Sequence, residues 1–471
     1  MNTTSPSREQ PRFSIGEAKE RLKTAIERAF AGPAPPVTGD QPLRRIEIPL
    51  RPVAQSPILL ACRGAQRTYW SSRGGALECV GLGCAETLAA STREEAGEVF
   101  ARMRQMVCAG AGVRYYGGMR FDPTQTPRPH WTPFGLARFV LPRFEVLREK
   151  KHFTLACNLV WKENDNPALL LPKLLMELAS LRLEPETAGD GITSGVGDRR
   201  DEPSESEWAP MLGEAMQRIS RGDLQKIVLA RESRFTFDNA PDGPALLQRL
   251  IGLTRDSYHF CFETPGGAAF LGASPERLYR REGRRIYSEA VAGTRPRGRD
   301  GAEEADYARA LLESGKDRHE HALVMDALRD AFSQLCSEVE PGDEVSVLKL
   351  HCCQHLYWPI EGTLKAAGAE AHILRLLHPT PAVGGTPTAD AVRAIGEIEP
   401  FDRGWYTGPV GWIGADGAEF AVAIRSGLLA DGALHLYSGA GIVPESVAAE
   451  EWAEIENKMG TFIQCLGATH D

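Results

Sequence analysis

Apolar residues recur along the first part of the chain with the spacing of helices and of strands in turn. Between residues 14 and 32 they fall every three or four positions, after a Ser14–Glu17 capping box and before Gly32, which predicts a helix. Further on, short β-like runs at 45–49, 58–62, 139–141 and 153–160 alternate with helical segments at 92–107 and 168–181. This irregular alternation favours an α+β fold over the regular βαβ repeat of a Rossmann sheet.

A polar segment, residues 187–206, contains almost no side chain that could pack in a core. Such a composition is typical of an exposed, flexible linker. We therefore expect an N-terminal part, residues 1–206, that completes an α+β body, and a catalytic region at residues 207–471.

Residues 225–231 follow the turn Gly222-Asp223 and are predicted to form a strand. With the two-residue period of a strand, Lys226 shares a face with Val228 and Ala230. A lysine on an apolar face is either an edge-strand gatekeeper or a desolvated amine that burial pushes toward neutrality. This stretch by itself favours the gatekeeper.

Two acids in a predicted helix, roughly residues 303–335, lie on its apolar stripe. Asp317 and Glu320 align with positions 324, 328 and 335 at 100° per residue, and burying them is unfavourable unless a cation pairs with them. His319 and His321 flank Glu320, but neighbouring helical positions point apart and no H-E-x-x-H spacing exists, which argues against zinc.

The predicted last helix, roughly residues 445–464, carries Glu451, Glu454 and Lys458 on one narrow stripe. Alone, this stripe is most simply explained as a surface Glu–Lys pair. Two helices that each offer carboxylates can instead build an all-oxygen site of the kind that Mg²⁺ prefers. Three glycine-rich stretches, at 292–298, 383–386 and 438–443, either form tight turns or bring backbone N–H groups close to an anionic oxygen.

Composition narrows the classes of function. The 471 residues carry a net charge of −9, with 42% hydrophobic and 25% charged residues, which fits a globular protein and argues against a nucleic-acid binder. No apolar run approaches the ~20 residues of a membrane helix. The ten cysteines include no C-x-x-C pair, so we expect reduced thiols and a cytoplasmic location.

Residues 207–471 closely resemble the chorismate-binding enzymes, which include isochorismate, salicylate, anthranilate and aminodeoxychorismate synthases. The resemblance rests on motifs in the same order along the chain: K-I-V-L-A-R at 226–231, A-S-P-E-R-L at 273–278, A-G-T-R-P-R-G at 292–298, K-D-R-H-E-H at 316–321, H-P-T-P-A-V-G-G-T-P at 378–387, Y-T-G-P-V-G at 406–411 and G-A-G-I-V at 439–443. It implies a body of two large, mostly antiparallel sheets packed face to face with helices outside.

Differences within the family favour an isochorismate synthase. The lysine at position 226 resembles the isochorismate and salicylate synthases, which have lysine there. Aminodeoxychorismate synthases have a nucleophilic lysine two residues before a Gly-Thr pair, where this chain reads V-A-G-T at 291–294. Residues 115–118 and 138–143 resemble the menaquinone-type isochorismate synthases. A salicylate synthase, which goes on to eliminate pyruvate, is the alternative enzyme, although these generally have a hydroxyl residue at the position of Ala382. A non-catalytic chorismate-binding module is the third interpretation.

The resemblance also implies roles for individual residues. Lys226 would be the base that activates water for attack at C2 of chorismate, and Glu276 the acid that protonates the oxygen leaving C4. Glu320 and Glu454 would bind Mg²⁺, with Asp317 and Glu451 nearby. The substrate would be held by Thr294, His378, Tyr406, Arg425, Gly439, Gly441 and Lys458. Isochorismate synthases of this kind commonly act as monomers without a glutaminase subunit.

Overall fold

The computed structural model describes residues 11–31, 43–161, 165–183, 196–350 and 353–467. Its strands form one continuous antiparallel network that folds into two sheets, because β5 (Ala137–Glu149) pairs along its length with β3 (Leu77–Ala90) and at its start with β4 (Arg114–Met119). This arrangement confirms the predicted α+β class with large antiparallel sheets.

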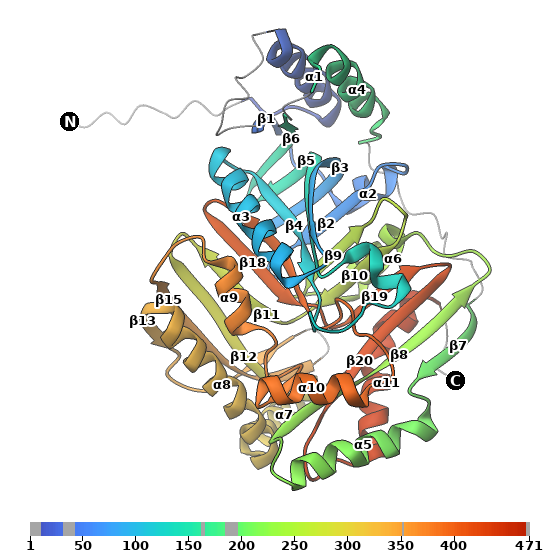
Figure 1. The fold of residues 1–471 in the computed structure, drawn as a ribbon, viewed down its shortest axis with the longest axis vertical. Coiled ribbons are helices and arrows are strands. Elements are labelled where there is room, and N and C mark those ends of the chain that lie inside the picture. Colours follow the sequence, from blue (N-terminus) through green and yellow to red (C-terminus); the bar gives the residue numbers. More distant parts are fainter. Residues whose placement is uncertain (1–10, 32–42, 162–164, 184–195, 351–352, 468–471) are drawn as a thin grey trace.

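The first sheet runs from one end of the molecule to the other (Figure 1). It begins with β1 (Leu43–Leu50) and β6 (His152–Val160) and continues through β5 and β3. The next strands, in spatial order, are β2 (Arg67–Ser71), β9 (Tyr258–Glu263), β10 (Ala269–Ser274), β19 (Ser426–Ala430), β20 (Ala433–Ile442) and β8 (Lys226–Phe237). Strands β7 (Val196–Glu202) and β16 (Gly385–Thr386) both pair with β8.

The second sheet continues from β4 through the catalytic region. Its strands are β17 (Pro409–Gly414), β18 (Gly417–Val422), β11 (Arg277–Glu282), β12 (Arg285–Pro296), β15 (Cys353–Leu364), β13 (Cys336–Pro341) and β14 (Ser346–Lys349). The N-terminal part thus contributes strands to both sheets, since β2 pairs with β9 and β4 pairs with β17.

An aromatic core fills the space between the two sheets. Phe260 and Phe270 of the first sheet pack there with Tyr116 and Val410 of the second. The alternation of a strand sends the next residue to the opposite face, so Cys261 belongs to a separate core under the outer helices. The sheets are therefore packed face to face, as the resemblance implied.

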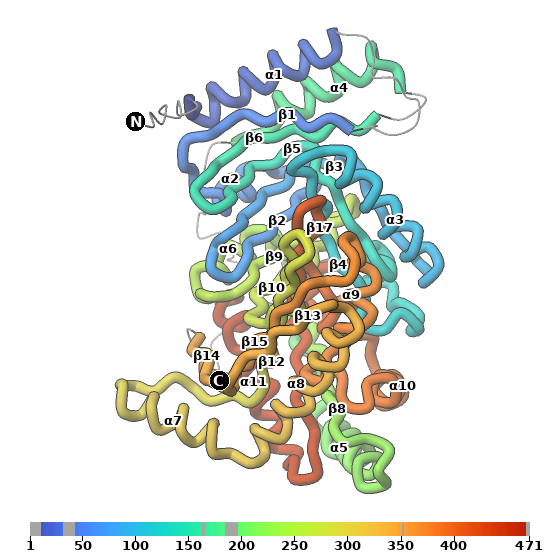
Figure 2. The backbone as a smooth tube through the Cα atoms, turned by 90° about the vertical axis from the view of Figure 1, so that its left-hand side faces the viewer, coloured from blue at the N-terminus to red at the C-terminus, as the bar shows by residue number. Residues whose placement is uncertain are grey.

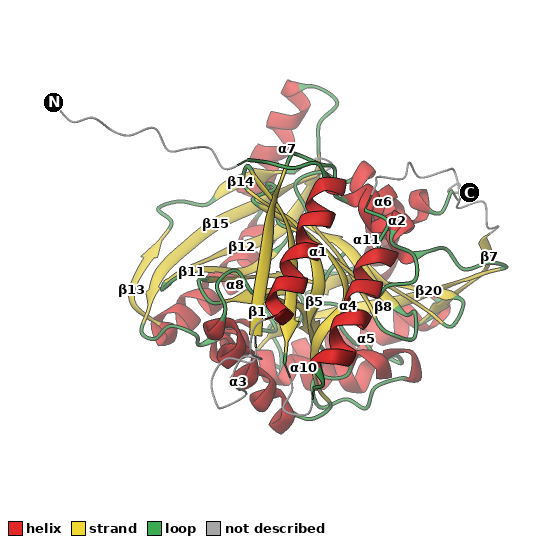
Figure 3. Cartoon of the chain, turned by 90° about the horizontal axis from the view of Figure 1, so that it is seen from above, coloured by secondary structure: helices red, strands yellow, loops and turns green. Residues whose placement is uncertain are grey.

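Helices cover the outer faces. They are α1 (Ile15–Ala31), α2 (Ser56–Ala61), α3 (Arg93–Ala109), the 3₁₀ helix η1 (Pro129–Phe134), α4 (Pro167–Ser180), α5 (Glu205–Ser220), α6 (Gly243–Leu253), α7 (Gly301–Glu313), α8 (Gly315–Leu335), α9 (Glu370–Leu377), α10 (Thr388–Ile398) and α11 (Ala448–Cys465). Figures 1 and 2 show α1 and α4 at the opposite end of the molecule from α5, α7 and α8, and Figure 3 shows α1 and α4 side by side over the strands. None of the described helices combines the length and apolar character of a membrane span.

Three predicted elements differ from the structure. The segment 58–62 belongs to helix α2, which begins with Pro57 in its first turn. The helix expected at 303–335 is two helices, because the Ser314 side chain accepts the backbone N–H of Asp317 and starts α8 anew. Residues 187–195 lie outside the described residues, but the rest of the expected linker forms strand β7 and the start of α5.

Strand β7 forms despite its polar sequence. It pairs antiparallel with the last part of β8, so its backbone supplies hydrogen bonds that do not depend on apolar side chains. Arg199 also binds the carboxylate of Glu456 on α11, at 2.6 and 2.7 Å. The polar composition therefore marks the exposed edge of the sheet instead of a linker.

Candidate active site

A cavity of about 320 Å³ opens where the two sheets diverge. Its walls include Val228 of β8, the 437–441 stretch of β20, and the end of β12 from Val291 to Arg295, while α8 and α11 add charged side chains. The volume is in the range of small-molecule sites, and most of the polar residues singled out from the sequence line it.

Lys226 lies at the start of β8 with a side chain that is 1% exposed. Its ammonium donates to Oε1 of Glu320 at 2.6 Å. The strand is covered at this point, because Thr386 of β16 pairs with Lys226 and Ile442 of β20 pairs with Ile227. Lys226 is therefore a buried amine and not the gatekeeper of an exposed edge.

Glu276 follows Ser274 and Pro275 in the tight connection between β10 and β11. The Ser274 hydroxyl donates to the Val422 carbonyl at 2.6 Å and accepts the Glu276 N–H at 3.2 Å, which fixes the turn that points Glu276 into the cavity wall. Desolvation and the nearby carboxylate of Glu289 raise the pKa of Glu276 to about 7, against the opposing effect of Lys226. A carboxyl with this pKa can hold and release a proton near neutral pH.

Two residues beside Glu276 escaped the sequence reasoning. Glu289 of β12 is fully buried and binds Nη2 of Arg73 at 2.6 Å, and Arg73 also donates to the Pro275 carbonyl at 2.6 Å. Glu289 could have been noticed in the sequence, because this acid directly precedes the apolar run at 290–292. Arg73 sits in the turn between β2 and β3, and no local pattern marked it.

Four carboxylates reach the cavity from two helices: Asp317 and Glu320 from α8, and Glu451 and Glu454 from α11. Each has a partner within the chain. Arg295 binds Asp317 at 2.7 Å, Lys226 binds Glu320 at 2.6 Å, the Ser446 hydroxyl donates to Glu451 at 2.7 Å, and Lys458 binds Glu454 at 2.6 Å.

The donor atoms of these acids fit a hard divalent cation. Desolvation, reinforced by the charge of Glu454, raises the pKa of Glu451, against the opposing hydrogen bond from Ser446. At Glu320 desolvation acts in the same direction, but Lys226 outweighs it and holds the pKa below its ordinary value. An all-oxygen set of carboxylates is the donor type that Mg²⁺ takes, usually with several water ligands.

Six of the seven residues predicted to hold the substrate line the cavity: Thr294, Tyr406, Arg425, Gly439, Gly441 and Lys458. Lys458 donates to the Gly439 carbonyl at 2.9 Å, which ties α11 to β20. A Cβ atom on Gly441 would lie 3.1 Å from Cε of Lys226 and 3.4 Å from Glu320, so glycine keeps the space beside that ion pair open.

His378 is the seventh, and it lies behind the cavity wall. Its Nε2 contacts the Phe121 carbonyl at 3.3 Å, and the two rings meet edge to face. Desolvation lowers the pKa of His378 to about 4, so the ring is neutral at physiological pH. Its position supports the wall near Val383 and Ala382, both of which line the cavity.

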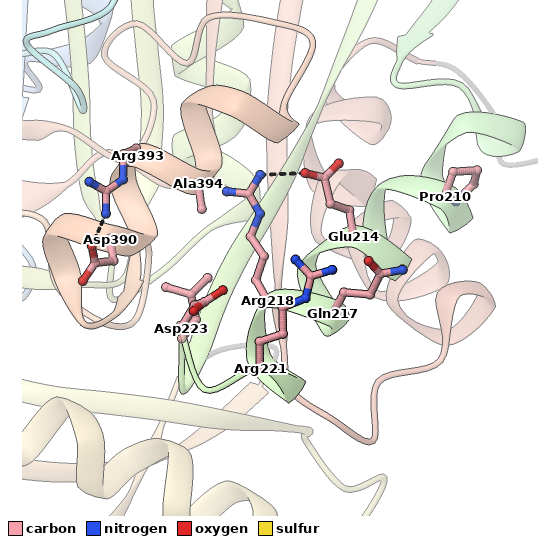
Figure 4. A pocket seen from close by; sticks show the side chains of 11 residues that line it. Pro210, Glu214, Gln217, Arg218, Arg221, Asp223, Asp390, Arg393 and Ala394 are labelled. Atoms are coloured by element: carbon pink, nitrogen blue, oxygen red, sulfur yellow. Dashed lines mark hydrogen bonds and ion pairs between the residues drawn. The ribbon is translucent and has the colours of Figure 1, made fainter.

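A more voluminous groove, about 1020 Å³, lies between α5 and α10 (Figure 4). Two ion pairs lie along its surface: Arg218 binds Glu214 at 2.6 Å, and Arg393 binds Asp390. The groove offers no buried acid–base pair of the kind formed by Lys226 and Glu320. The smaller cavity is therefore the better candidate for chemistry.

Comparison with known proteins identifies the family to which the chain belongs. Residues 41–467 match the family described as chorismate binding enzyme. The chain is 38% identical over 364 residues to isochorismate synthase 2, chloroplastic, of Arabidopsis thaliana, an alignment that covers 75% of this chain and 64% of the plant protein. It is 32% identical over 417 residues to isochorismate synthase MenF of Bacillus subtilis (strain 168), covering 85% of this chain and 88% of that protein.

The fold is also similar to a solved structure. The menaquinone-specific isochorismate synthase MenF from Escherichia coli superposes with a TM-score of 0.83 at 27% sequence identity, over 96% of this chain and 100% of that chain. The similarity thus extends through the N-terminal part as well as the region that holds the cavity.

Proposed function

Because the chain belongs to the chorismate-binding enzyme family, we propose that it is an isochorismate synthase, which converts chorismate to isochorismate. The observation that carries the proposal is a buried amine beside an acidic carboxyl: Lys226 pairs with Glu320 of the cavity wall, and Glu276, whose pKa is about 7, lines the same cavity. The similarity to proteins named isochorismate synthases, which extends over most of the chain, also supports the proposal.

The reaction adds water at C2 of chorismate and expels the hydroxyl from C4, while the ring double bonds shift. Water is a poor nucleophile and hydroxide a poor leaving group, so the two ends of the substrate need a base and an acid. Lys226 takes the proton from water at Nζ, in an arrangement in which it no longer pairs with Glu320. Glu276 gives its proton to the oxygen that leaves C4.

Glu320 and Glu454 would hold Mg²⁺, with Asp317 and Glu451 beside them. The bound ion would supply a positive charge that orients the ring carboxylate of chorismate and offsets its repulsion from the acids. The four carboxylates that line the cavity from two helices, an all-oxygen donor set, support this assignment.

Cationic and polar side chains across the cavity would bind the second carboxylate of the substrate. Arg425 and Lys458 offer charged donors, and Tyr406 offers a hydroxyl. Backbone N–H groups at Gly439 and Gly441 can approach the substrate closely because these residues have no side chain. Thr294 borders the ring, and His378 supports the wall from behind.

The similarity to the menaquinone-specific enzyme supports a role in menaquinone biosynthesis. We further propose that the chain acts in the cytoplasm, as a monomer without a glutaminase subunit. Ala382, which lines the cavity without a hydroxyl group, favours release of isochorismate over the pyruvate elimination of a salicylate synthase. A non-catalytic module is disfavoured because Lys226, Glu276 and Glu454 are all present at the cavity.

The test is to incubate the purified chain with chorismate and Mg²⁺ and to identify the product by NMR. We expect isochorismate, and no turnover in excess EDTA. Anthranilate, aminodeoxychorismate or unchanged chorismate in the presence of Mg²⁺ would contradict the proposal.

A further inference from the structure

Outside the candidate active site, His130, Glu232 and His435 meet where η1, β8 and β20 come together. In the described part of the chain, these three residues form a possible metal-ligand group, because one ligand atom from each lies within 4.8 Å of the ligand atoms of the other two. The two imidazole rings stack with their centroids 4.3 Å apart, and Nδ1 of His435 lies 2.6 Å from Oε1 of Glu232.

Two atoms in this cluster are buried without a hydrogen-bond partner. Glu232 is 4% exposed, and its Oε2 receives no hydrogen bond. Nε2 of His130 is likewise shielded from solvent and has no partner. Leaving a buried polar atom unsatisfied is unfavourable, so a group that both atoms could bind would remove a considerable penalty.

We propose that His130, Glu232 and His435 form a binding site for a divalent transition-metal ion, for which Zn²⁺ is the best match. Two imidazoles and one carboxylate are a common ligand set for zinc, whereas Mg²⁺ and Ca²⁺ prefer oxygen donors alone. The ion takes the place of the proton between His435 Nδ1 and Glu232 Oε1, and His435 binds it as a neutral imidazole with its proton on Nε2. The ring of His130, which is only half-buried, turns out of the stack to direct Nε2 at the ion.

The surrounding charges permit a cation. Nη1 of Arg128 lies 3.9 Å from Oε2 of Glu232, but the Arg128 guanidinium makes shorter bonds to both carboxylate oxygens of Glu202, at 2.9 and 3.2 Å. The charge of Arg128 is thus neutralised by Glu202, and Glu232 keeps its own charge for the metal ion.

The site would connect three segments that are far apart in sequence. His130 comes from the N-terminal part, whereas Glu232 and His435 lie on the two strands that lead toward the catalytic cavity. Trp131, next to His130, donates to the Tyr437 hydroxyl at 3.2 Å, and Tyr437 lines that cavity. A metal ion here stabilises the junction behind the active site.

Metal binding by the full-length chain tests the proposal. Metal-free protein is titrated with Zn²⁺ by calorimetry in millimolar Mg²⁺, which occupies the catalytic carboxylates, and with Co²⁺ by visible absorption. We expect one tight site, and at least a ~10-fold weaker affinity in His130→Ala and in Glu232→Gln. Zn²⁺ should also raise the thermal midpoint of the wild type and leave that of His130→Ala unchanged.

Two control variants exclude binding elsewhere. His152→Ala removes an exposed histidine and Cys108→Ser an exposed thiol, and both should keep the wild-type affinity. The proposal is overturned if no stoichiometric Zn²⁺ binding occurs, if His130→Ala binds as tightly as the wild type, or if the Co²⁺ spectrum has a thiolate charge-transfer band. His130 is half-buried at the surface, so its variant folds and decides the question even where Glu232→Gln does not.

Discussion

Lys226 is the residue on which the proposed chemistry depends most. Its replacement by alanine should leave the fold intact and lower kcat at least ~10²-fold, the low end for a lost general base. Steady-state rates with chorismate and Mg²⁺ measure the effect, and circular dichroism checks the fold. Lys349→Ala, which removes an exposed lysine at the edge of β14, is the matched control. Near-wild-type turnover of Lys226→Ala would show that the lysine only balances the charge of Glu320.

Glu276 predicts a specific dependence on pH. A general acid works in its protonated form, and the pKa of Glu276 is about 7, so the pH profile of kcat/KM should contain an ionisation at about 7 that Glu276→Gln removes. The profile is measured from about pH 6 to about pH 9, the window that brackets this pKa. A profile without this ionisation, or one that Glu276→Gln leaves unchanged, would exclude Glu276 as the acid.

The role proposed for Lys226 also leads to a prediction about which nucleophile the enzyme accepts. The Lys226 side chain beside the site of attack suits activation of a water molecule and would crowd or repel an ammonium ion. Saturating ammonium salts at neutral pH should therefore yield no aminated product by mass spectrometry. Detection of anthranilate or aminodeoxychorismate would reject this role of Lys226.

A local signal in the sequence drew attention to some single residues, although at Lys226 the stretch alone favoured an edge-strand gatekeeper. Lys226 stood out on an apolar strand, and Asp317 stood out on an apolar helix stripe; both are buried. Arg73 left no such signal, because its importance comes from contacts with Pro275 and Glu289, some two hundred positions away. His378 belonged to a matching motif, but a motif does not say whether a side chain faces the cavity or lies behind its wall.

The carboxylates on helices α8 and α11 lead to a prediction about the Mg²⁺ requirement. Glu320→Gln and Glu454→Gln each remove one charged oxygen ligand, so each should weaken Mg²⁺ binding and raise the Mg²⁺ concentration needed for activity. Calorimetric titration with Mg²⁺ and the Mg²⁺ dependence of the rate measure both effects. Glu450→Gln, an exposed position on the same helix α11, is the control. Full activity in excess EDTA would contradict a metal site.

Elements with a strong period were predicted better than those held by tertiary pairing. Helix α1, with its Ser14–Glu17 capping box, and α11 have nearly the expected bounds. Strand β7 was missed because its stability comes from backbone pairing with β8 and from Arg199, neither of which depends on hydrophobic periodicity. The break between α7 and α8 depends on one side-chain cap at Ser314, which the long helical pattern concealed.

The fold class of the whole molecule could be expected, but the pairing of its strands could not. Alternating apolar positions indicate that a strand has two faces, without identifying its neighbours. The aromatic core between the sheets draws on Tyr116 of β4 and Phe270 of β10, which the sequence separates widely. For the same reason, the contribution of the N-terminal part to the cavity, through Arg73, became visible only in the folded chain.

The overall equilibrium separates the two enzymes that the same residues could form. Exchange of one allylic hydroxyl for another changes the free energy little, so an isochorismate synthase should stop at a mixture of chorismate and isochorismate. Elimination of pyruvate creates an aromatic ring and runs to completion.

The most direct measurement follows chorismate, isochorismate and pyruvate with time, starting in turn from each of the two isomers, with Mg²⁺ present and lactate dehydrogenase as the coupled detector of pyruvate. We predict that both reactions converge on the same mixture and that little pyruvate forms. Pyruvate released in proportion to the chorismate consumed, or no conversion from either side, would contradict the proposed function.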